Sequence, residues 1–219
     1  MGAAGTRDVH ADSDPLTTAC PGVAVWKASK PEPQTTSPSP SHVTNPALQA
    51  SLLSMAKEDQ DARKSWAAGP PNPGSGASKS IRRIDAVHLR ALRHIVAANG
   101  VPTINQVGGD GMSAFWLLVQ HADRDLHLQE TVLRSLRSAN SGVPLDEIAL
   151  LTDRVRVNDG RAQLYGTQFK QIGDKFVPLR VEDQEHLSAR REKMGLMPMQ
   201  DYECVLRLSY GTAAAATHP

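Results

Sequence analysis

The chain has 219 residues, enough for one ordinary domain or for one domain with a long tail. Its 24 lysine and arginine residues nearly balance its 23 aspartate and glutamate residues, so charge does not point to nucleic acid, an anionic membrane or an acidic ligand. Aromatic residues make up 4% of the chain, too few for a base-stacking surface, and no apolar stretch approaches the roughly 18 residues needed to cross a bilayer. We therefore expect neither a nucleic-acid partner nor a membrane partner.

Residues 1–45 are predicted to form a long disordered tail, because the Pro, Ser and Thr residues around 27–46 offer almost nothing to bury. Acidic residues stand where a secretory signal would have a basic start and an apolar run, which favours a cytoplasmic location. Cys20 and Trp26 are expected in an unpacked tail or a weakly docked arm. With Cys204 far away in the sequence, the two cysteines by themselves predict no disulfide framework and no four-ligand zinc site.

Two amphipathic helices are predicted at the start of a single helical domain that spans residues 46–204. The first, from about Pro46 to Trp66, places apolar residues on one stripe at three- and four-residue steps. Residues 69–80, rich in Gly, Pro and Ser, are expected to be a loop or short linker inside the domain. The second helix follows that loop and ends at Asn99-Gly100, a typical helix stop.

A helix that is apolar on every side is predicted next. Its sequence, MSAFWLLV, follows a glycine-rich opening at Gly108 to Gly111 and is typical of an internal element. A further helix is expected in residues 126–139. After Pro144, two acidic residues suit the start of a helix that continues to Asn158.

From Gln163 to Val181 the pattern changes to two short strands or an extended flap, joined by a turn at Gly173-Asp174. Pro178 places the second strand at a sheet edge. Helical character returns in residues 182–195, and residues 205–219 are expected to be a flexible tail. The predicted fold class is therefore a mainly α, orthogonal helical bundle with a small β-hairpin and a long disordered N-terminal tail.

Ionisable residues on apolar helix faces are the first candidates for a functional site, because a buried charge needs a partner or a chemical role. Asp59 lies on the apolar stripe of the first helix, His121 ends the central helix, and Asp123 continues its stripe. We expect a catalytic set of His121, Asp123 and Asp59, in which Asp123 orients His121 as a general acid or base. The alternative is a cap network, in which Asp123 or Asp125 caps the next helix and His121 packs beneath.

No metal site is predicted, although HADRDLH at residues 121–127 contains four potential ligands. On a continuous helix only His121 and Asp125 share a face, so a metal held by these two with His127 is the less favoured hypothesis. His88 also lies on an apolar face and is expected to be a core histidine with a hydrogen-bond partner.

Substrate-binding residues are expected around the YGTQ sequence. Gly166 permits close backbone approach, and its neighbours offer hydroxyl and amide groups, namely Gln163, Tyr165, Thr167 and Gln168. The alternative is a hairpin whose polar face is simply solvated.

Gln120 and Arg154 complete the expected substrate-binding set. Gln120 directly precedes His121. Arg154 is suited to clamp an anionic group, although an ordinary salt bridge, for example to Glu147, is the favoured interpretation.

The strings AFWLLVQHADRD, ALLTDRV and QLYGTQF, preceded by EDQDAR, resemble a bacterial family of unknown function that is common in actinomycetes. The resemblance runs from about Leu48 to Tyr202 and includes, in order, Asp59-Gln60, Arg63, Asp85, Trp116 to Asp123, Asp153-Arg154, Gln163 to Gln168, Arg191 and Gly195-Leu196. It departs at His88, where the family pattern has Asn, and at Leu126, where Pro is frequent. The resemblance implies a fold unit and an ordered set of polar positions, and it implies no reaction.

Two functions of different classes fit these observations. The first is an enzyme for a small polar molecule, working by hydrolysis or acid-base rearrangement without a cofactor, because no nicotinamide, flavin or haem motif is present. The second is an adaptor that binds another protein and whose buried polar residues are structural.

Overall fold

The computed structural model describes residues 15–30, 43–67, 76–138, 141–172 and 175–210. The helices are α1 (Pro15–Ala19), α2 (Pro21–Ser29), α3 (Pro46–Ala67), α4 (Gly76–Asn99), α5 (Ile104–Gln120), α6 (Leu126–Leu136), α7 (Leu145–Asn158), the 3-10 helix η1 (Gln184–His186), α8 (Leu187–Lys193) and α9 (Met199–Tyr210); the strands are β1 (Phe169–Ile172) and β2 (Lys175–Pro178). The fold is mainly helical with a small antiparallel hairpin, as predicted.

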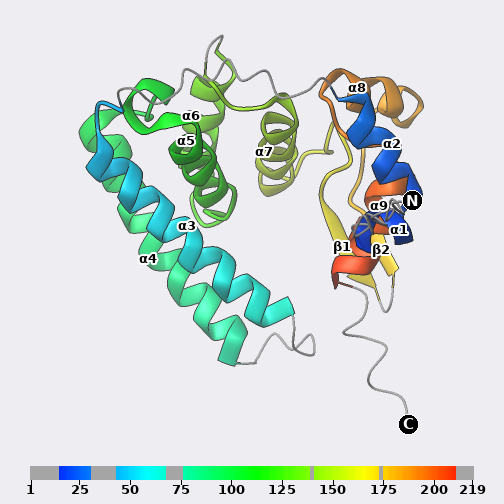
Figure 1. The fold of residues 1–219 in the computed structure, drawn as a ribbon, viewed down its shortest axis with the longest axis horizontal. Helices are drawn as coiled ribbons and strands as arrows, with labels where there is room; N and C mark the ends of the chain where they lie inside the picture. Colours follow the sequence, from blue (N-terminus) through cyan, green and yellow to red (C-terminus); the bar gives the residue numbers. More distant parts are fainter. Residues whose placement is uncertain (1–14, 31–42, 68–75, 139–140, 173–174, 211–219) are drawn as a thin grey trace, which may run out of the picture.

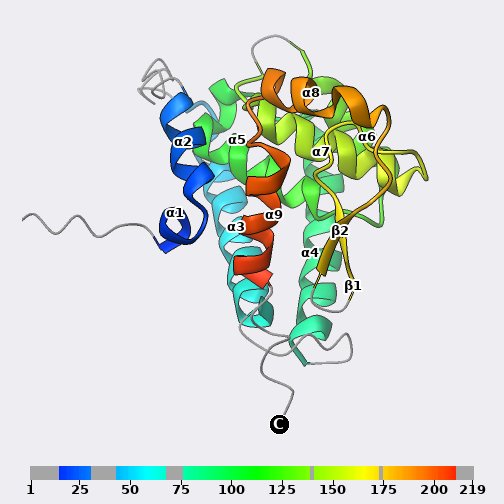
Figure 2. The same ribbon diagram turned by 90° about the vertical axis from the view of Figure 1, so that its right-hand side faces the viewer.

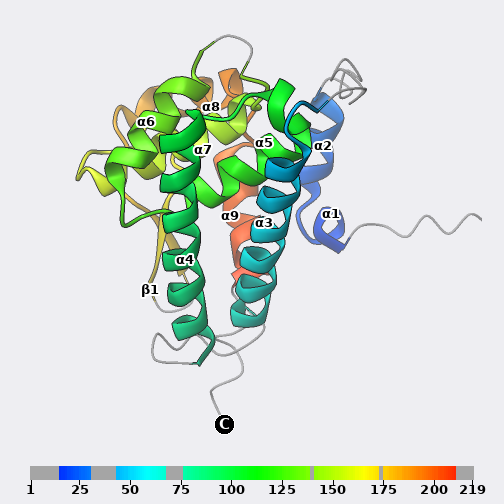
Figure 3. The ribbon, with the colours of Figure 1, turned by 90° about the vertical axis from the view of Figure 1, so that its left-hand side faces the viewer.

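The described elements form an arch (Figure 1). Helices α3 and α4 lie side by side and form one leg, as Figure 3 also shows. The hairpin, α1, α2, α8 and α9 lie on the opposite side, and α5, α6 and α7 lie between the two. Helices α5 and α7 therefore lie between the leg formed by α3 and α4 and the group formed by the hairpin, α1, α2, α8 and α9.

Of the two helices in the leg, α3 agrees with the prediction and α4 begins earlier than predicted. The apolar stripe of α3 is buried at Leu48 and Leu52, as its spacing predicts. Helix α4 begins at Gly76, so the last part of the expected loop is helical, and it packs against α3. Residues 68–75 lie outside the described residues.

Helix α5 is the central element of the core, as predicted. Thr103 and Gln106 form a capping box at its start, and Gly108, with φ +68°, interrupts the helical backbone there. Phe115 and Val119 are fully buried. Because Gly111 also approaches Val107 closely, the glycines let the helix enter a crowded core.

The segment 163–168 is a loop, which agrees with the extended flap, one of the two predicted alternatives, and Gln163 forms an isolated bridge with Val181. Strand β1 begins only at Phe169, which pairs with Pro178 at the end of the two-stranded sheet. Three backbone amides of the segment donate to a buried carboxylate, which withdraws them from strand pairing. The expected Gly173-Asp174 turn lies outside the described residues.

The largest departure from the prediction concerns the two ends of the chain. Residues 15–30 form two short helices inside the expected tail, and α9 occupies residues for which no helix is predicted. Cys20 and Cys204, for which the sequence predicts no bridge, form a disulfide that joins these regions. Residues 1–14, 31–42 and 211–219 lie outside the described residues.

Within the ranges given above, no helix has the length and apolar character required to span a membrane.

Candidate functional site

Asp59 projects from α3 into the protein interior, as predicted, and its side chain is 1% exposed. Arg63, one turn further along α3, places its Nε 3.1 Å from Oδ1 and 3.2 Å from Oδ2 of Asp59. Gln60 donates from Nε2 at 2.9 Å, and the Nδ1 of His121 lies 3.0 Å from the carboxylate. The buried charge is therefore matched by a cation and two further donors.

The hydrogen-bonding role of His121 follows from these neighbours. An ionised carboxylate only accepts, so the Nδ1 of His121 must carry a proton when it lies 3.0 Å from Asp59. Arg63 Nε lies 3.1 Å from Nδ1 and 3.1 Å from Oδ1 of Asp59; because the anion is the stronger acceptor, we assign the single hydrogen of Nε to the carboxylate. Among the described residues, nothing hydrogen-bonds the Nε2 of His121. The neutral imidazole therefore keeps a free lone pair on Nε2, and the side chain is 18% exposed.

Arg63 joins the His121 pair to a second acid. Its Nη2 lies 2.7 Å from Oδ1 of Asp85, a residue of α4. We call Asp59, Arg63, Asp85 and His121 the Asp59 cluster. It draws on α3, α4 and the end of α5, elements that are separate in sequence and packed together in the fold (Figure 1).

The two acids of the cluster respond differently to burial. Burial alone would raise the pKa of Asp59, but the hydrogen bonds and charges of His121 and Arg63 outweigh it and lower the pKa to about 2. Burial raises the pKa of Asp85, and the charges of Arg63 and His121 only partly oppose that rise. Asp59 is therefore a fixed anion, whereas Asp85 binds a proton more readily than an ordinary aspartate.

Asp123 does not orient His121, contrary to the prediction. Helix α5 ends at Gln120, so Asp123 lies in the following turn and its side chain is 48% exposed. It accepts hydrogen bonds from Arg154 at 3.3 Å and from Asn158 at 3.1 Å, both on α7. Asp123 thus ties the end of α5 to α7, and the partner of Arg154 is Asp123 instead of the expected Glu147.

Asp125 acts as the N-cap of α6, as the cap interpretation predicts. Its Oδ1 accepts from the backbone N–H of Leu128 at 3.0 Å, and its Oδ2 pairs with Arg93. Across the residues that the structure describes, no group of three His, Cys, Asp or Glu side chains is arranged to hold a metal ion.

Asp153 holds the segment 163–168, which we call the YGTQ loop. Its carboxylate accepts from the backbone N–H groups of Leu164, Tyr165 and Thr167 and from the hydroxyl of Thr167, at 2.6 to 3.1 Å. Asp153 itself is fully buried on α7. One carboxylate therefore takes the place of a strand partner for this loop.

The remaining polar groups of the YGTQ loop are also used internally. Gln163 donates to the carbonyls of Gln168 and Leu179 and accepts from the N–H of Gln168. Buried Arg191 of α8 donates to the carbonyl of Tyr165 at 2.5 Å. Three of the expected substrate-binding residues, Gln163, Thr167 and Gln168, thus shape the loop through internal hydrogen bonds.

The other three expected substrate-binding residues keep unused polar atoms. Gln120 is 5% exposed, and its Oε1 has no hydrogen-bond partner within the described ranges. The buried Nε of Arg154 is likewise unpaired there, and no described residue hydrogen-bonds the hydroxyl of Tyr165. The unpaired atoms of Gln120 and Arg154 have almost no accessible surface, so a polar molecule would reach them only if the surrounding side chains moved.

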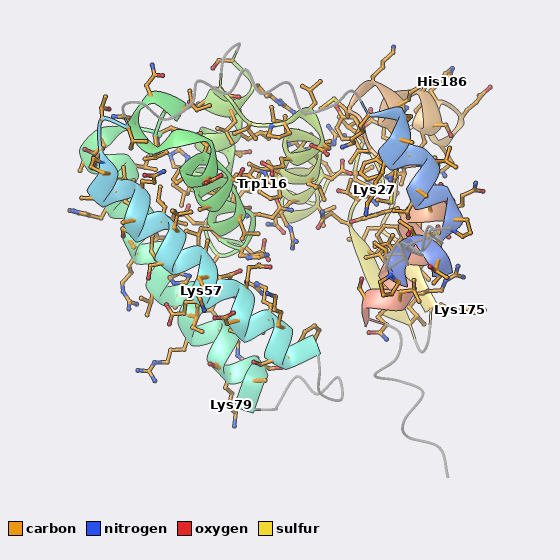
Figure 4. All side chains as sticks on the ribbon, viewed as in Figure 1. Lys27, Lys57, Lys79, Trp116, Lys175 and His186 are labelled. Atoms are coloured by element: carbon orange, nitrogen blue, oxygen red, sulfur yellow. A yellow bond between two sulfur atoms is a disulfide. The ribbon has the colours of Figure 1, made fainter. Side chains whose placement is uncertain are left out.

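The seam between α5 and α7 is closed by two hydrogen bonds. Trp116, labelled in Figure 4, donates to the carbonyl of Glu147 at 2.9 Å at one end of the seam. Arg154 donates to Asp123 at 3.3 Å at the other end. Trp116 lies on α5 and Asp123 in the turn after it, so the contacts join both α5 and that turn to α7. Burial, with a smaller effect of Asp146, raises the pKa of Glu147 to about 7. The seam therefore holds polar groups that lack partners.

A hollow of about 600 Å³ lies elsewhere, between α3 and α4. Glu58, Asp61 and Ser80 are among its lining residues, and none of the predicted site residues lines it. His88, buried as predicted, contacts Glu58 at 3.1 Å from the other side. The hollow is therefore separate from the Asp59 cluster.

A family model described as a family of unknown function (DUF6624) matches residues 46–214. The chain belongs to this family. The searches of curated proteins and of solved structures found no match.

The DUF6624 region contains the Asp59 cluster and the contacts of Asp153 with the YGTQ loop, because both lie within residues 59–191. It also includes α9 with Cys204, but it excludes α1 and α2 with Cys20. The N-terminal helices therefore lie outside the region that the family model matches.

Four residues without a predicted chemical role make the contacts of the Asp59 cluster and of the YGTQ loop, namely Arg63, Asp85, Asp153 and Arg191. Arg63 lies four residues after Asp59 on the same helix face, a spacing that predicts an ion pair. Asp85, Asp153 and Arg191 make contacts over 11 to 26 residues of sequence. The spacing of apolar residues along one helix does not reveal contacts between residues so far apart in the sequence.

Proposed function

We propose that this DUF6624 protein is an enzyme that moves a proton on a small polar molecule, with His121 as general base or acid. Asp59 is the residue that positions it. The observation that carries the proposal is the imidazole whose Nδ1 lies 3.0 Å from a buried carboxylate while Nε2 is free and the ring is partly exposed. A carboxylate so placed fixes the tautomer and stabilises the imidazolium that forms when Nε2 takes a proton.

The substrate would be held by the unpaired groups of Gln120, Arg154 and Tyr165. Gln120 offers a buried acceptor, and Arg154 offers a buried donor. A molecule with neighbouring donor and acceptor groups would satisfy both. Hydrolysis or an acid-base rearrangement is the reaction class that this set supports, and the YGTQ loop contributes Tyr165 from a rigid frame.

The second candidate is an adaptor that binds another protein. Two large apolar side chains are exposed on the leg formed by α3 and α4, Leu53 at 40% and Val87 at 45%. Exposed apolar residues on neighbouring helices favour a protein partner. In that case the Asp59 cluster would fix the order of the helices.

The similarity to an actinomycete-rich bacterial family, with its WLLVQHAD, DR and QxYGTQ motifs, supports a bacterial source as part of this proposal. We do not propose a cytoplasmic location, although the N-terminal sequence favours one, because of the disulfide. A structural disulfide such as Cys20–Cys204 is typical of oxidising compartments.

The test is a thermal-shift screen of polar metabolites on wild type and on His121→Asn. A ligand at 100 times its Kd adds about 2.7 kcal/mol to stability, a shift of several degrees. His121→Asn should melt within about 3 °C of wild type, since one hydrogen bond to Asp59 is lost, and it should no longer respond to the ligand.

The matched control is His186→Asn. His186 also pairs with an aspartate, Asp183, at 2.9 Å, but its side chain is 67% exposed on the surface. This variant should respond to the ligand as wild type does. A normal response from His121→Asn would contradict the enzyme proposal. A large loss of melting temperature in His121→Asn without ligand would favour the adaptor.

A further inference from the structure

The N-terminal helices α1 and α2 are fastened to the C-terminal helix α9 (Figure 2). We call residues 15–30 the arm. The disulfide between Cys20 and Cys204 spans 184 residues of sequence. Val23 is fully buried, and Trp26 donates from Nε1 to the carbonyl of Gly195 at 3.2 Å. The arm is thus a docked element, outside the DUF6624 region, whose covalent anchor lies inside it.

The contact between the arm and α9 is close. A Cβ on Gly22 would lie 1.9 Å from Oδ1 of Asp201, so the Asp201 side chain would have to move to admit a larger residue there. At the far end of the arm, Lys30 pairs with Asp146 of α7 at 2.7 Å. The arm therefore bridges α9 and α7.

Helix α9 in turn supports the YGTQ loop. Tyr202 donates from its hydroxyl to the carbonyl of Thr167 at 3.3 Å, and its ring meets Phe169 edge-on at 5.6 Å. Met199 packs against Gly166, where a Cβ would lie 2.7 Å from the methyl group. The loop is held by Asp153 of α7 and by side chains of α9.

The two helices of the arm are too short to be stable on their own. Helix α1 has five residues and α2 has nine, and helices of that length are marginal in water. Cys20 is 2% exposed, so its thiol has no open path to solvent, whereas Cys204 is only partly buried. Exchange with a reductant therefore begins at Cys204 and releases Cys20.

We propose that the arm is a redox-dependent strap, which the Cys20–Cys204 disulfide holds on α9 and which thereby stabilises the YGTQ loop. Its formation removes two electrons and two protons from the two thiols, and a small-molecule disulfide oxidant accepts them through thiol-disulfide exchange. A dithiol reverses the step and becomes a cyclic disulfide itself. The strap does not depend on the acid-base proposal, because it concerns the loop's stability and not its chemistry.

The experiment compares the full-length oxidised protein with the same protein after dithiothreitol. Reduction should make trypsin cleavage after Lys27 at least tenfold faster and should speed hydrogen exchange at the amides of Tyr165 and Thr167 severalfold. The melting temperature should fall by roughly 5 to 10 °C, as for loss of a disulfide that closes a long loop. Cys204→Ser should reproduce these changes without reductant.

Three controls make the result decisive. Cys20→Ser leaves the family domain unaltered and replaces Cys204→Ser if that variant fails to fold. Dithiothreitol should not affect either serine variant, because each variant keeps only one of the chain's two cysteines and has no disulfide within the chain to reduce. Val25→Ser, at a position that is 71% exposed on the arm, should behave as wild type.

Equal cleavage rates in the oxidised and reduced protein would overturn the strap. Two titratable thiols in the air-purified protein would do the same. Faster cleavage with unchanged exchange at Tyr165 and Thr167 would overturn its link to the YGTQ loop.

Discussion

Asp59 and Asp153 are both almost completely buried carboxylates, but they are satisfied in different ways. Asp153 accepts four hydrogen bonds from neutral donors of one short loop, which leaves it no outward-facing partner. Asp59 is held by Arg63 and His121, and His121 has a free nitrogen beyond it. A saturated carboxylate fixes a backbone, whereas a carboxylate behind a half-satisfied imidazole can support proton transfer.

The largest expected effect tests the structural half of this comparison. Asp153→Ala leaves three buried backbone N–H groups without acceptors, and should cost about 3 to 5 kcal/mol of unfolding free energy. Urea denaturation measures the loss. Asp123→Ala removes an exposed carboxylate and should cost less than about 1 kcal/mol. Similar losses of unfolding free energy in Asp153→Ala and Asp123→Ala would contradict the structural role of Asp153.

The next effect tests the charge on Asp59. Its pKa is lowered from 3.8 to about 2 in the folded state, so its stabilisation is complete above pH 3.8 and is lost as the pH falls toward 2. The lowering corresponds to about 2 kcal/mol. Urea midpoints of wild type and Asp59→Asn, measured at pH 6 and at pH 3, should converge at the lower pH. Parallel midpoints would show that Asp59 is not held as an anion.

Periodicity was sufficient for most helices of the domain, although not for α9, and for the inward direction of Asp59, since these depend on residues a few positions apart. The sequence placed Asp59 and His121 in one site but assigned the carboxylate partner of His121 to Asp123, because it does not show that the turn after Gln120 carries Asp123 to α7. The alternation in the YGTQ loop left a strand and an extended flap open, and it could not show that Asp153 accepts from three of the loop's backbone N–H groups. The arm was missed since its order depends on a bond to a residue 184 positions away.

Two buried glutamines extend the comparison to uncharged groups. Gln163 makes three hydrogen bonds and Gln120 leaves Oε1 unpaired, although both are at most 5% exposed. Gln163→Met should cost about 2 kcal/mol, because it orphans backbone groups. Gln120→Met removes an unsatisfied acceptor and should be neutral or stabilising by up to about 1 kcal/mol. Thermal melts of the two variants decide the matter, and a large loss in Gln120→Met would reveal a partner for that amide.

Glu147 provides the smallest effect and a third kind of carboxylate, one that burial leaves without a compensating cation. Its pKa is raised from 4.5 to about 7, so the folded state holds the proton more tightly than the unfolded chain. The linked stability is greatest below pH 4.5, declines as the pH rises to 7, and is constant above that value. Glu147→Gln is neutral throughout, so it should exceed wild type by about 1 to 2 kcal/mol at pH 8 and match it at pH 4, the partial exposure of the side chain limiting the gain. This window lies above the one in which Asp59 titrates, so urea midpoints at pH 3, 4, 6 and 8 separate the two groups. A loss of stability in Glu147→Gln at pH 8 would mean that the ionised carboxylate has a partner in the folded protein, and Glu147 would then resemble Asp59 instead of contrasting with it.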